Sequence, residues 1–334
     1  MRIGVTYDLR ADYLALGFGE EETAEFDAVE TIDAICRALT GLGFHPIRVG
    51  NIRKLAAALV QGERYDAVFN ICEGMKGLAR EAQVPTLLDA YDIPYVFSDP
   101  LTLALAHDKS MAKRVVRDQG VPTPDFAVVA TARDVASVKL SYPLFLKPIS
   151  EGSGKGIDQH SRVDDAPRLA AVAQDLLTRY RQPVLVEEFL PGREFTVGIT
   201  GTGQDASVLG VTEIVRTDKF IGDGYGYRNK EYWEDKVVIR LVEDKESEDA
   251  ARVALAAWRA LRCRDGGRVD IRNDSDGRAN FIEVNPLAGL RPDYSDLCFI
   301  ANFKHVSYQD LIGKIMDSFL KRHPALRKRH RAAA

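Results

Sequence analysis

Apolar residues in the first hundred positions follow two alternating patterns. Short uninterrupted runs are typical of buried strands, and they occur at Ile3 to Tyr7, Pro46 to Val49 and Tyr65 to Ile71. Around these runs, apolar residues recur every three or four positions, which predicts helices at 27–42, 55–60 and 82–91. Strands that alternate with helices form parallel sheets with crossover helices, so we expect a parallel α/β sheet here.

A different organisation follows the helix predicted at 109–118, because the segment VPTP at 121–124 is typical of a linker. The elements predicted beyond it are strands at 143–150, 184–190, 194–200, 267–273 and 280–286 and helices at 169–180, 248–261 and 308–319. The turn sequence DSDGR joins the last two strands and predicts a hairpin. The chain after Thr212 is polar, aromatic and Gly-rich, so we expect it to be loop-like.

Composition places the chain among ordinary globular proteins. Of its 334 residues, 46% are apolar and 28% are charged, which predicts two or three domains with real cores. No apolar run approaches the roughly 18 residues of a membrane helix, and the N-terminus lacks the features of a signal peptide. The four cysteines are far apart and form no C-x-x-C pair, so zinc and redox motifs are unsupported. We therefore expect a cytoplasmic protein with reduced thiols.

Charge adds little evidence for a polyanionic partner. The net charge is −4, which gives no electrostatic footprint for nucleic acid. The tail RKRHRAAA is basic, and either a short contact with a polyanion or a frayed helix end explains it, the second being the simpler reading.

Carboxylates converge on the hairpin predicted at 267–286. Glu283 and Asn285 are two residues apart on one strand, so their side chains share a face, and Asp270 on the other strand can face them. Two carboxylates and an amide oxygen are ligands that Mg²⁺ or Mn²⁺ accepts, with substrate phosphates completing the shell. We expect a divalent metal here, although solvated hairpin carboxylates would show the same pattern.

Glycines at 152, 154 and 156 follow a strand that ends near Lys147. Such a stretch lets successive backbone N–H groups approach a polyphosphate, although a Gly-rich hairpin tip is an equally good reading of the glycines alone. Lys147 could point its ammonium group into a cleft, and Lys109 is a second candidate phosphate ligand. On its own, a solvated helix face would also explain Lys109.

The segment VLVEEFLPGREFTV places carboxylates on both sides of a short apolar stretch. In a nucleotide site, Glu187 and the backbone would meet the adenine amine, with Glu188 beside them. Leu190 would lie near the base plane, and Glu194 would accept from the ribose hydroxyls. A strand pair joined by a Pro-Gly turn is the alternative.

Together these motifs resemble the ATP-grasp superfamily, and within it the D-alanine–D-alanine ligase family. The matching motifs are Asp108-Lys109, the K-P-x-x-E-G-S loop at 147–153, the V-E-x-x-x-x-G-x-E-F-T-V strand at 186–197, and the G-R-x-D and E-x-N hairpin. The resemblance implies an α/β protein: a Rossmann-like domain at 1–106, and an ATP-grasp fold whose two α+β subdomains lie at 107–187 and 188–322. A basic tail follows at 323–334.

The resemblance implies an ATP-dependent carboxylate–amine ligase that works through an acyl phosphate. The implied nucleotide ligands in the Gly-rich loop are Glu151, Gly152, Ser153 and Gly154, and Ser153 also belongs to the catalytic set. Arg268 has the chemistry to neutralise the transferring phosphoryl group and the tetrahedral intermediate, and Lys230 matches a lysine of the family's mobile loop. Two alternatives remain: a kinase with a stable phosphoryl product, and a nucleotide-binding protein without catalysis.

The sequence departs from the family pattern on the substrate side. The family's glutamate for the ammonium group of the first amino acid has two candidates here, Glu25 and Asp27, and a solvated acidic loop is an equal alternative. An early family motif is replaced by NICEGMKGLAREAQ, in which Glu73 and the polar residues Arg80, Glu81 and Gln83 could contact substrate.

Further departures concern the mobile loop and the end signature. The family's Lys-Tyr pair appears as Lys230-Glu231-Tyr232, so its tyrosine is displaced or absent. Near the end, Arg291 could clamp a carboxylate or lie in a surface loop, and Ser295 falls one residue late. We expect small amino-acid-like substrates, with D-alanine no more favoured than a related amino acid. Dimers are common in this family, but no interface can be identified from the sequence.

Overall fold

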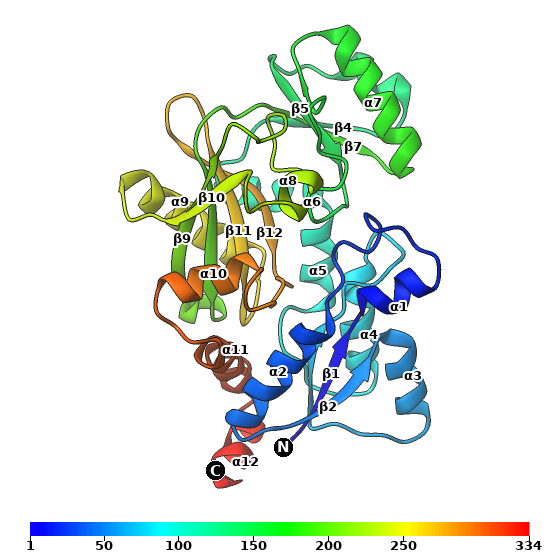
Figure 1. The fold of residues 1–334 in the computed structure, drawn as a ribbon, viewed down its shortest axis with the longest axis vertical. Coiled ribbons are helices and arrows are strands. Elements are labelled where there is room, and N and C mark those ends of the chain that lie inside the picture. Colours follow the sequence, from blue (N-terminus) through cyan, green and yellow to red (C-terminus); the bar gives the residue numbers. More distant parts are fainter. Residues whose placement is uncertain (334) are drawn as a thin grey trace.

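The computed structural model describes residues 1–333 and contains three separate sheets (Figure 1). The first sheet is parallel, in the order β2-β1-β3, which confirms the predicted α/β organisation. Its elements are β1 (Arg2–Tyr7), α1 (Arg10–Ala15), α2 (Val29–Gly41), β2 (His45–Gly50), α3 (Ile52–Val60), β3 (Ala67–Ile71), η1 (Arg80–Ala82), α4 (Gln83–Ala90) and α5 (Pro100–His107). All five residues of β3 are buried, as its apolar run predicts.

The second sheet is antiparallel, in the order β4-β7-β5-β6, and helix α7 packs on it. Its elements are β4 (Phe126–Val129), η2 (Ala132–Ser137), β5 (Leu144–Pro148), β6 (Arg162–Val163), α7 (Ala166–Tyr180) and β7 (Val184–Glu188). Leu169, Ala173 and Leu176 of α7 fill the core against this sheet. Helix α6 (Lys109–Asp118) precedes the sheet in the chain but contributes Ala112 and Val116 to a different core.

The third sheet is antiparallel, in the order β10-β9-β8-β11-β12, and helix α9 covers one face. Its elements are β8 (Glu194–Thr200), η3 (Gly203–Asp205), β9 (Ser207–Arg216), α8 (Tyr227–Glu231), β10 (Val237–Leu241), α9 (Lys245–Ala260), β11 (Gly266–Asn273) and β12 (Ala279–Asn285). The expectation that the chain is loop-like after Thr212 is corrected, because residues 213–216 belong to β9 and residues 237–241 form β10. The segment 217–236 between them is irregular apart from the short helix α8. The domain boundaries expected from the sequence stay predictions.

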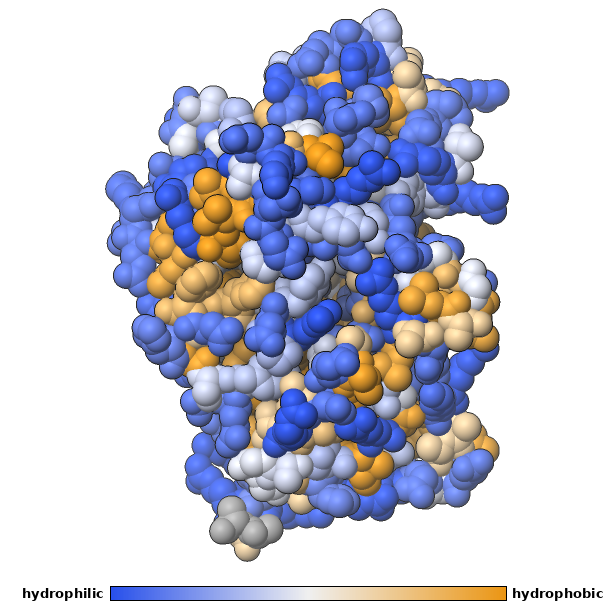
Figure 2. Space-filling view, in the orientation of Figure 1, coloured by the Kyte–Doolittle hydropathy of each residue, from blue (hydrophilic) through white to orange (hydrophobic). Residues whose placement is uncertain are grey.

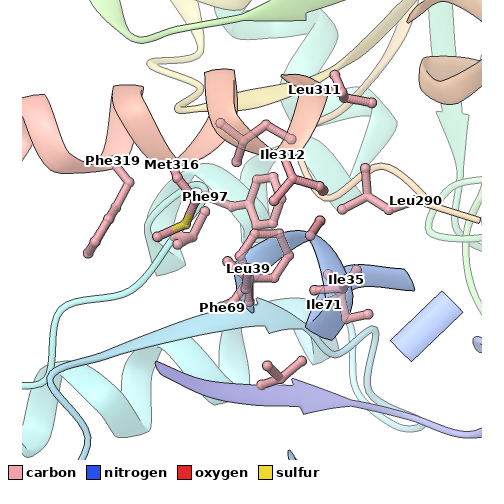
Figure 3. Packing of buried hydrophobic residues seen from close by; sticks show 14 of the residues in the cluster. Ile35, Leu39, Phe69, Ile71, Phe97, Leu290, Leu311, Ile312, Met316 and Phe319 are labelled. Carbon is pink, nitrogen blue, oxygen red and sulfur yellow. The ribbon is translucent and has the colours of Figure 1, made fainter. Parts of the chain in front are cut away.

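Both ends of the chain share one core with the first sheet. Helix α11 (Tyr308–Arg322) packs against α2, and Figure 3 shows Leu39, Phe69 and Met316 meeting there. Helix α10 (Asp296–Phe303) joins the same core. The basic tail forms helix α12 (Pro324–Ala333), in which the His330 ring stacks on Phe44 at 4.1 Å. The third sheet is therefore fixed relative to the first by packed helices.

The surface is mostly hydrophilic in the view of Figure 2, with apolar residues in separate patches. Among residues 1–333, no helix combines the length and apolar character needed to cross a membrane. The four cysteines are free, and three of them are buried.

Candidate active site

Two cavities meet where the three sheets converge. The larger, of about 190 Å³, and the smaller, of about 80 Å³, share wall residues. The shared residues are Lys109, Glu151, Tyr225, Lys230, Arg268 and Glu283. Of the nucleotide ligands expected from the sequence, the smaller cavity contains Lys109, Lys147, Glu151, Gly154, Glu187, Glu188, Leu190 and Glu194. The larger contains Gly152 and Ser153, and all four substrate candidates, Glu25, Glu73, Arg291 and Ser295.

The hairpin β11–β12 brings the expected metal ligands onto one face. Asp270 pairs with Glu283 across the ladder, and Arg268 pairs with Asn285, so the four side chains form two adjacent cross-strand pairs. The Asp270 carboxylate accepts from the Arg268 guanidinium at 2.6 Å and from the Thr196 hydroxyl at 3.0 Å. The amide oxygen of Asn285 can accept from Arg268 at 3.2 Å. Arg268 and Asp270 are two residues apart on β11, and Glu283 and Asn285 are two residues apart on β12. This spacing places all four side chains in one cluster.

The two carboxylates of the hairpin have pKa values shifted in opposite directions. Burial raises the pKa of Asp270 to about 6, and the facing Glu283 carboxylate adds to this against the opposing effect of Arg268. The pKa of Glu283 is lowered despite its burial, because Lys109 and Lys147 lie near it; the Lys109 ammonium is 3.4 Å away. Within residues 1–333 no three His, Cys, Asp or Glu side chains form a metal-binding group, so any ion here needs Asn285 or substrate oxygens as well.

A buried ion cluster supports the smaller cavity. Glu187 lies 2.7 Å from the Lys147 ammonium and 2.9 Å from that of Lys113, and all three side chains are at most 5% exposed. Burial alone would raise the pKa of Glu187, but the two lysines outweigh it and hold that pKa at about 2. Burial lowers the pKa of Lys113 to about 8. The Glu187 carboxylate, expected at the adenine amine, is thus already bound by two lysines.

The Gly-rich loop touches the irregular segment 217–236, which we call the lid. The backbone N–H of Tyr227 donates to the carbonyl of Gly154 at 2.9 Å, and a Cβ at Gly154 would lie 2.8 Å from lid backbone atoms. Gly154 also has φ of +69°. Glycine at 154 therefore permits both the turn and the close approach of the lid over the cavity.

Replacing Gly154 by alanine is expected to lift the lid and to lower kcat/KM for ATP by roughly 10–100-fold, since small misplacements of binding groups have effects of that order. Limited proteolysis should then cleave the lid faster than in the wild type. Gly120→Ala is the matched control, because its φ is +74° and nothing lies within 4 Å of the added Cβ. Equal loss in both variants would show that backbone strain, and not lid contact, is responsible.

The Glu25 carboxylate is held by two cations. It accepts from Arg80 at 3.2 and 2.9 Å and from Lys155 at 2.8 Å. Arg80 also donates to the carbonyl of Ser150 at 3.2 Å and contacts His107, whose other ring nitrogen lies 2.7 Å from Glu81. This network ties the N-terminal sheet to the Gly-rich loop.

The network predicts acid sensitivity. Burial would raise the pKa of Glu25, but Arg80 and Lys155 outweigh it and lower that pKa from 4.5 to about 2. Glu25 therefore stabilises the fold fully above its ordinary pKa, and that contribution is lost as pH falls from there towards 2. The free-energy gap between the wild type and Glu25→Gln should shrink between pH 6 and pH 3 in denaturant titrations. A gap independent of pH would contradict this assignment.

The remaining substrate candidates line the larger cavity from distant parts of the chain. Arg291 and Ser295 follow the hairpin, and the Ser295 hydroxyl accepts from the backbone N–H of Arg291 at 3.0 Å. Glu73 is the second residue after β3. Tyr232, which follows the predicted lid lysine, is 60% exposed, whereas Tyr225 and Tyr227 of the same lid line the cavity with Ser153.

Sequence reasoning missed two cations of this region, Lys113 and Lys155, which contact Glu187 and Glu25 respectively. Arg80 was a candidate for substrate contact, and the structure pairs it with Glu25. Lys113 lies four residues after Lys109 on the same helix, and Lys155 lies inside the Gly-rich motif, so their positions were visible signals. Their partners are 74 and 130 residues away and could not be found from local patterns.

Comparison with known proteins decides the family. Residues 115–317, more than half of the chain, match the family described as the D-ala D-ala ligase C-terminus. The chain belongs to the D-alanine–D-alanine ligase family. It is 33% identical over 279 residues to the D-alanine–D-alanine ligase of Xylella fastidiosa, covering 81% of this chain and 87% of the relative. It is 31% identical over 265 residues to the uncharacterised protein y4sG of Sinorhizobium fredii, covering 77% and 75%.

Solved structures of D-alanine–D-alanine ligases share the fold. The enzyme from Bacillus anthracis complexed with ATP matches with a TM-score of 0.73 at 21% identity, covering 96% of this chain and 98% of that one. The VanG D-Ala:D-Ser ligase from Enterococcus faecalis matches with a TM-score of 0.73 at 19% identity, covering 95% and 99%. These matches confirm the ATP-grasp fold. As a member of this family, the chain is an ATP-dependent ligase that forms C–N bonds.

Proposed function

We propose that the chain joins the carboxylate of one small amino acid to the amine of another, with an acyl phosphate as intermediate. The observation that supports this most strongly is the position of Arg268, Lys109 and Glu283 on the wall shared by both cavities. A phosphoryl group passing from the smaller cavity to a carboxylate in the larger one would cross this point. Phosphoryl transfer depends on positioning and on cations around the transferring group, and this wall supplies both.

The nucleotide would occupy the smaller cavity. Lys109 and Lys147 would neutralise phosphate oxygens, and the loop of Glu151, Gly152, Ser153 and Gly154 would cover them with backbone N–H groups. Glu188, Leu190 and Glu194 would line the far end for the base and ribose. Glu187 would act mainly by holding Lys147 in place, because its carboxylate is already paired.

Asp270, Glu283 and Asn285 would hold Mg²⁺, since two carboxylates and an amide oxygen suit a hard cation. When bound, the ion would supply positive charge at the phosphate oxygens. Thr196 orients Asp270 by donating to it at 3.0 Å. Arg268 and Lys109 already pair with these carboxylates, so a bound ion would share Asp270 and Glu283 with them.

Arg268 would act on both halves of the reaction. In the first, a carboxylate oxygen attacks the γ-phosphorus and ADP leaves; in the second, the amine attacks the acyl carbon, the C–O bond breaks and phosphate leaves. The Arg268 guanidinium would stabilise charge on the phosphoryl oxygens and then on the tetrahedral centre. Lys230 and Ser153 line the same cavity and would assist, while the lid excludes water that would hydrolyse the acyl phosphate.

Relatives named for D-alanine support D-alanine as the first substrate to test. Arg291, Ser295, Glu25 and Glu73 line the cavity that would hold the two substrates. Its volume of about 190 Å³ is below the roughly 300–1,000 Å³ of sites for drug-sized ligands, so small substrates fit it best.

The test is ADP and phosphate release with ATP and Mg²⁺ across D- and L-amino acids, alone and in pairs, with product masses recorded. The proposal expects phosphate release with at least one pair and a product lighter by one water than the sum of its substrates. A stable phosphorylated product without an amine acceptor would instead establish a kinase. No ATP turnover with any amino acid would overturn the proposal.

A further inference from the structure

The Glu25 carboxylate has little capacity left for a substrate. Its two oxygens already accept three hydrogen bonds from Arg80 and Lys155, at 2.8 to 3.2 Å, and its side chain is only 10% exposed. The Arg80 side chain is itself 8% exposed and anchored to the Ser150 carbonyl. A carboxylate offers about four acceptor positions, so an incoming ammonium group would find at most one of them free on Glu25, next to two cations that repel it. We therefore expect Glu25 to act mainly as a structural residue.

Glu73 is in the opposite situation. Its side chain lines the larger cavity, and among residues 1–333 its carboxylate has no hydrogen bond and no ion pair. Burial raises the pKa of Glu73, and the neighbouring carboxylates Glu81 and Glu25 raise it further against the opposing effect of Arg80. A partly buried carboxylate without a partner costs stability, and such groups are typically kept for a ligand.

The backbone next to Glu73 is held in place. The N–H of Gly74 donates to Asp8 at 3.0 Å, and Asp8 also accepts from the Tyr13 hydroxyl at 2.5 Å. Gly74 has φ of +70°, and a Cβ there would lie 2.7 Å from the carbonyl oxygen of Arg80. The turn after β3 is therefore fixed by contacts on both sides, which keeps the backbone of Glu73 beside the cavity.

The larger cavity carries charges of both signs. Its lining contains the cations Lys109, Lys230 and Arg268 and several carboxylates, among them Glu73, Asp27 and Glu283. A zwitterionic amino acid can therefore pair its carboxylate with the cations beside the phosphate path and its ammonium group with a carboxylate. A plain carboxylic acid can form only the first of these pairs.

We propose that Glu73, and not Glu25, binds the ammonium group of the amino acid whose carboxylate is activated. This inference rests on the proposed function and makes Glu73 a specificity-determining residue, which restricts the donor to substrates with a cationic amino group. A charge-assisted hydrogen bond of this kind corresponds to roughly 10–100-fold in affinity.

The test compares an amino acid with its desamino analogue. For alanine the analogue is propionate, measured as a substrate or as an inhibitor of ADP release at saturating ATP. Glu73→Gln should lower kcat/KM for the amino acid by roughly 10–100-fold. It should change kcat/KM for propionate, or its inhibition constant, by less than about twofold. Glu25→Gln should keep the wild-type preference for the amino group. Glu63→Gln is the control, because Glu63 is 52% exposed and pairs with Arg2 at the surface.

Thermal unfolding separates recognition from structural damage. Because burial and like charges penalise ionised Glu73, the Glu73→Gln variant should unfold at the same temperature as the wild type or above it. The inference would be overturned, with the ligase proposal intact, if Glu73→Gln lowered kcat/KM equally for alanine and propionate. It would also be overturned if Glu25→Gln lost the preference for alanine over propionate and Glu73→Gln kept it. A wild-type protein that turns over no amino acid would overturn the proposed function and this inference together.

Discussion

Replacing Asp270 by asparagine should lower ADP formation by at least about 100-fold with little effect on stability. Loss of one preorganised charged group at a reacting phosphoryl or acyl centre has effects of about this size. The amide can still accept from Arg268 and Thr196, which contact the carboxylate at 2.6 and 3.0 Å. Arg268 also keeps a second carboxylate, Asp296, at 3.4 Å, so the hairpin should keep its packing. The change removes the negative charge that the proposed metal site shares with Glu283.

Steady-state ADP release and a denaturant titration check this prediction together. Asp276→Asn is the matched control, because Asp276 lies in the turn of the same hairpin with 63% of its side chain exposed. Titration with Mg²⁺ should show a weaker apparent metal affinity in Asp270→Asn only. An Asp270→Asn variant with wild-type turnover would remove the hairpin from the mechanism.

The Glu187→Gln variant should lose about 3–5 kcal/mol of unfolding free energy, the usual cost of removing one partner from a buried ion pair. It leaves the ammonium groups of Lys113 and Lys147 buried without their shared carboxylate. Burial already lowers the pKa of Lys113 to about 8. For Lys147, burial acts in the same direction and Glu187 is the main group that raises the pKa, so without Glu187 both lysines should release protons more readily. The loss should therefore be smaller at pH 9.5 than at pH 7, because neutral lysines are cheaper to bury.

Urea titrations at the two pH values measure this loss. Glu188→Gln, at the next position, is the stability control, because its carboxylate accepts only a backbone N–H from Ser141 at 3.2 Å among residues 1–333. A pH-independent loss, or equal losses in both variants, would show that the cluster does not depend on charge pairing.

Local patterns in the sequence were enough to predict the elements that carry the metal ligands. The strands that became β11 and β12 have the period-two spacing and turn that bring Asp270 opposite Glu283. Apolar runs also predicted β1 and β3 of the parallel sheet. Strand β10 was missed because its alternating sequence VVIRL follows a long polar and aromatic lid, whose composition dominated the interpretation.

The pairing of buried charges could not be predicted in the same way. Glu25 reads as one of several acids in a polar loop, and only the fold brings Arg80 and Lys155 to it from 55 and 130 residues away. Likewise, the sequence made both Glu25 and Glu73 candidates for substrate binding. The two carboxylates differ because Glu25 pairs with Arg80 and Lys155, whereas Glu73 pairs with no cation among residues 1–333.

The central claim, ligation through an acyl phosphate, is tested most directly with a donor amino acid labelled with ¹⁸O in its carboxylate. The account predicts that each turnover moves one ¹⁸O atom into the released inorganic phosphate, with ADP as the other product, because the carboxylate oxygen that attacks the γ-phosphorus leaves with it. Unlabelled phosphate, or AMP and pyrophosphate in place of ADP, would contradict the account.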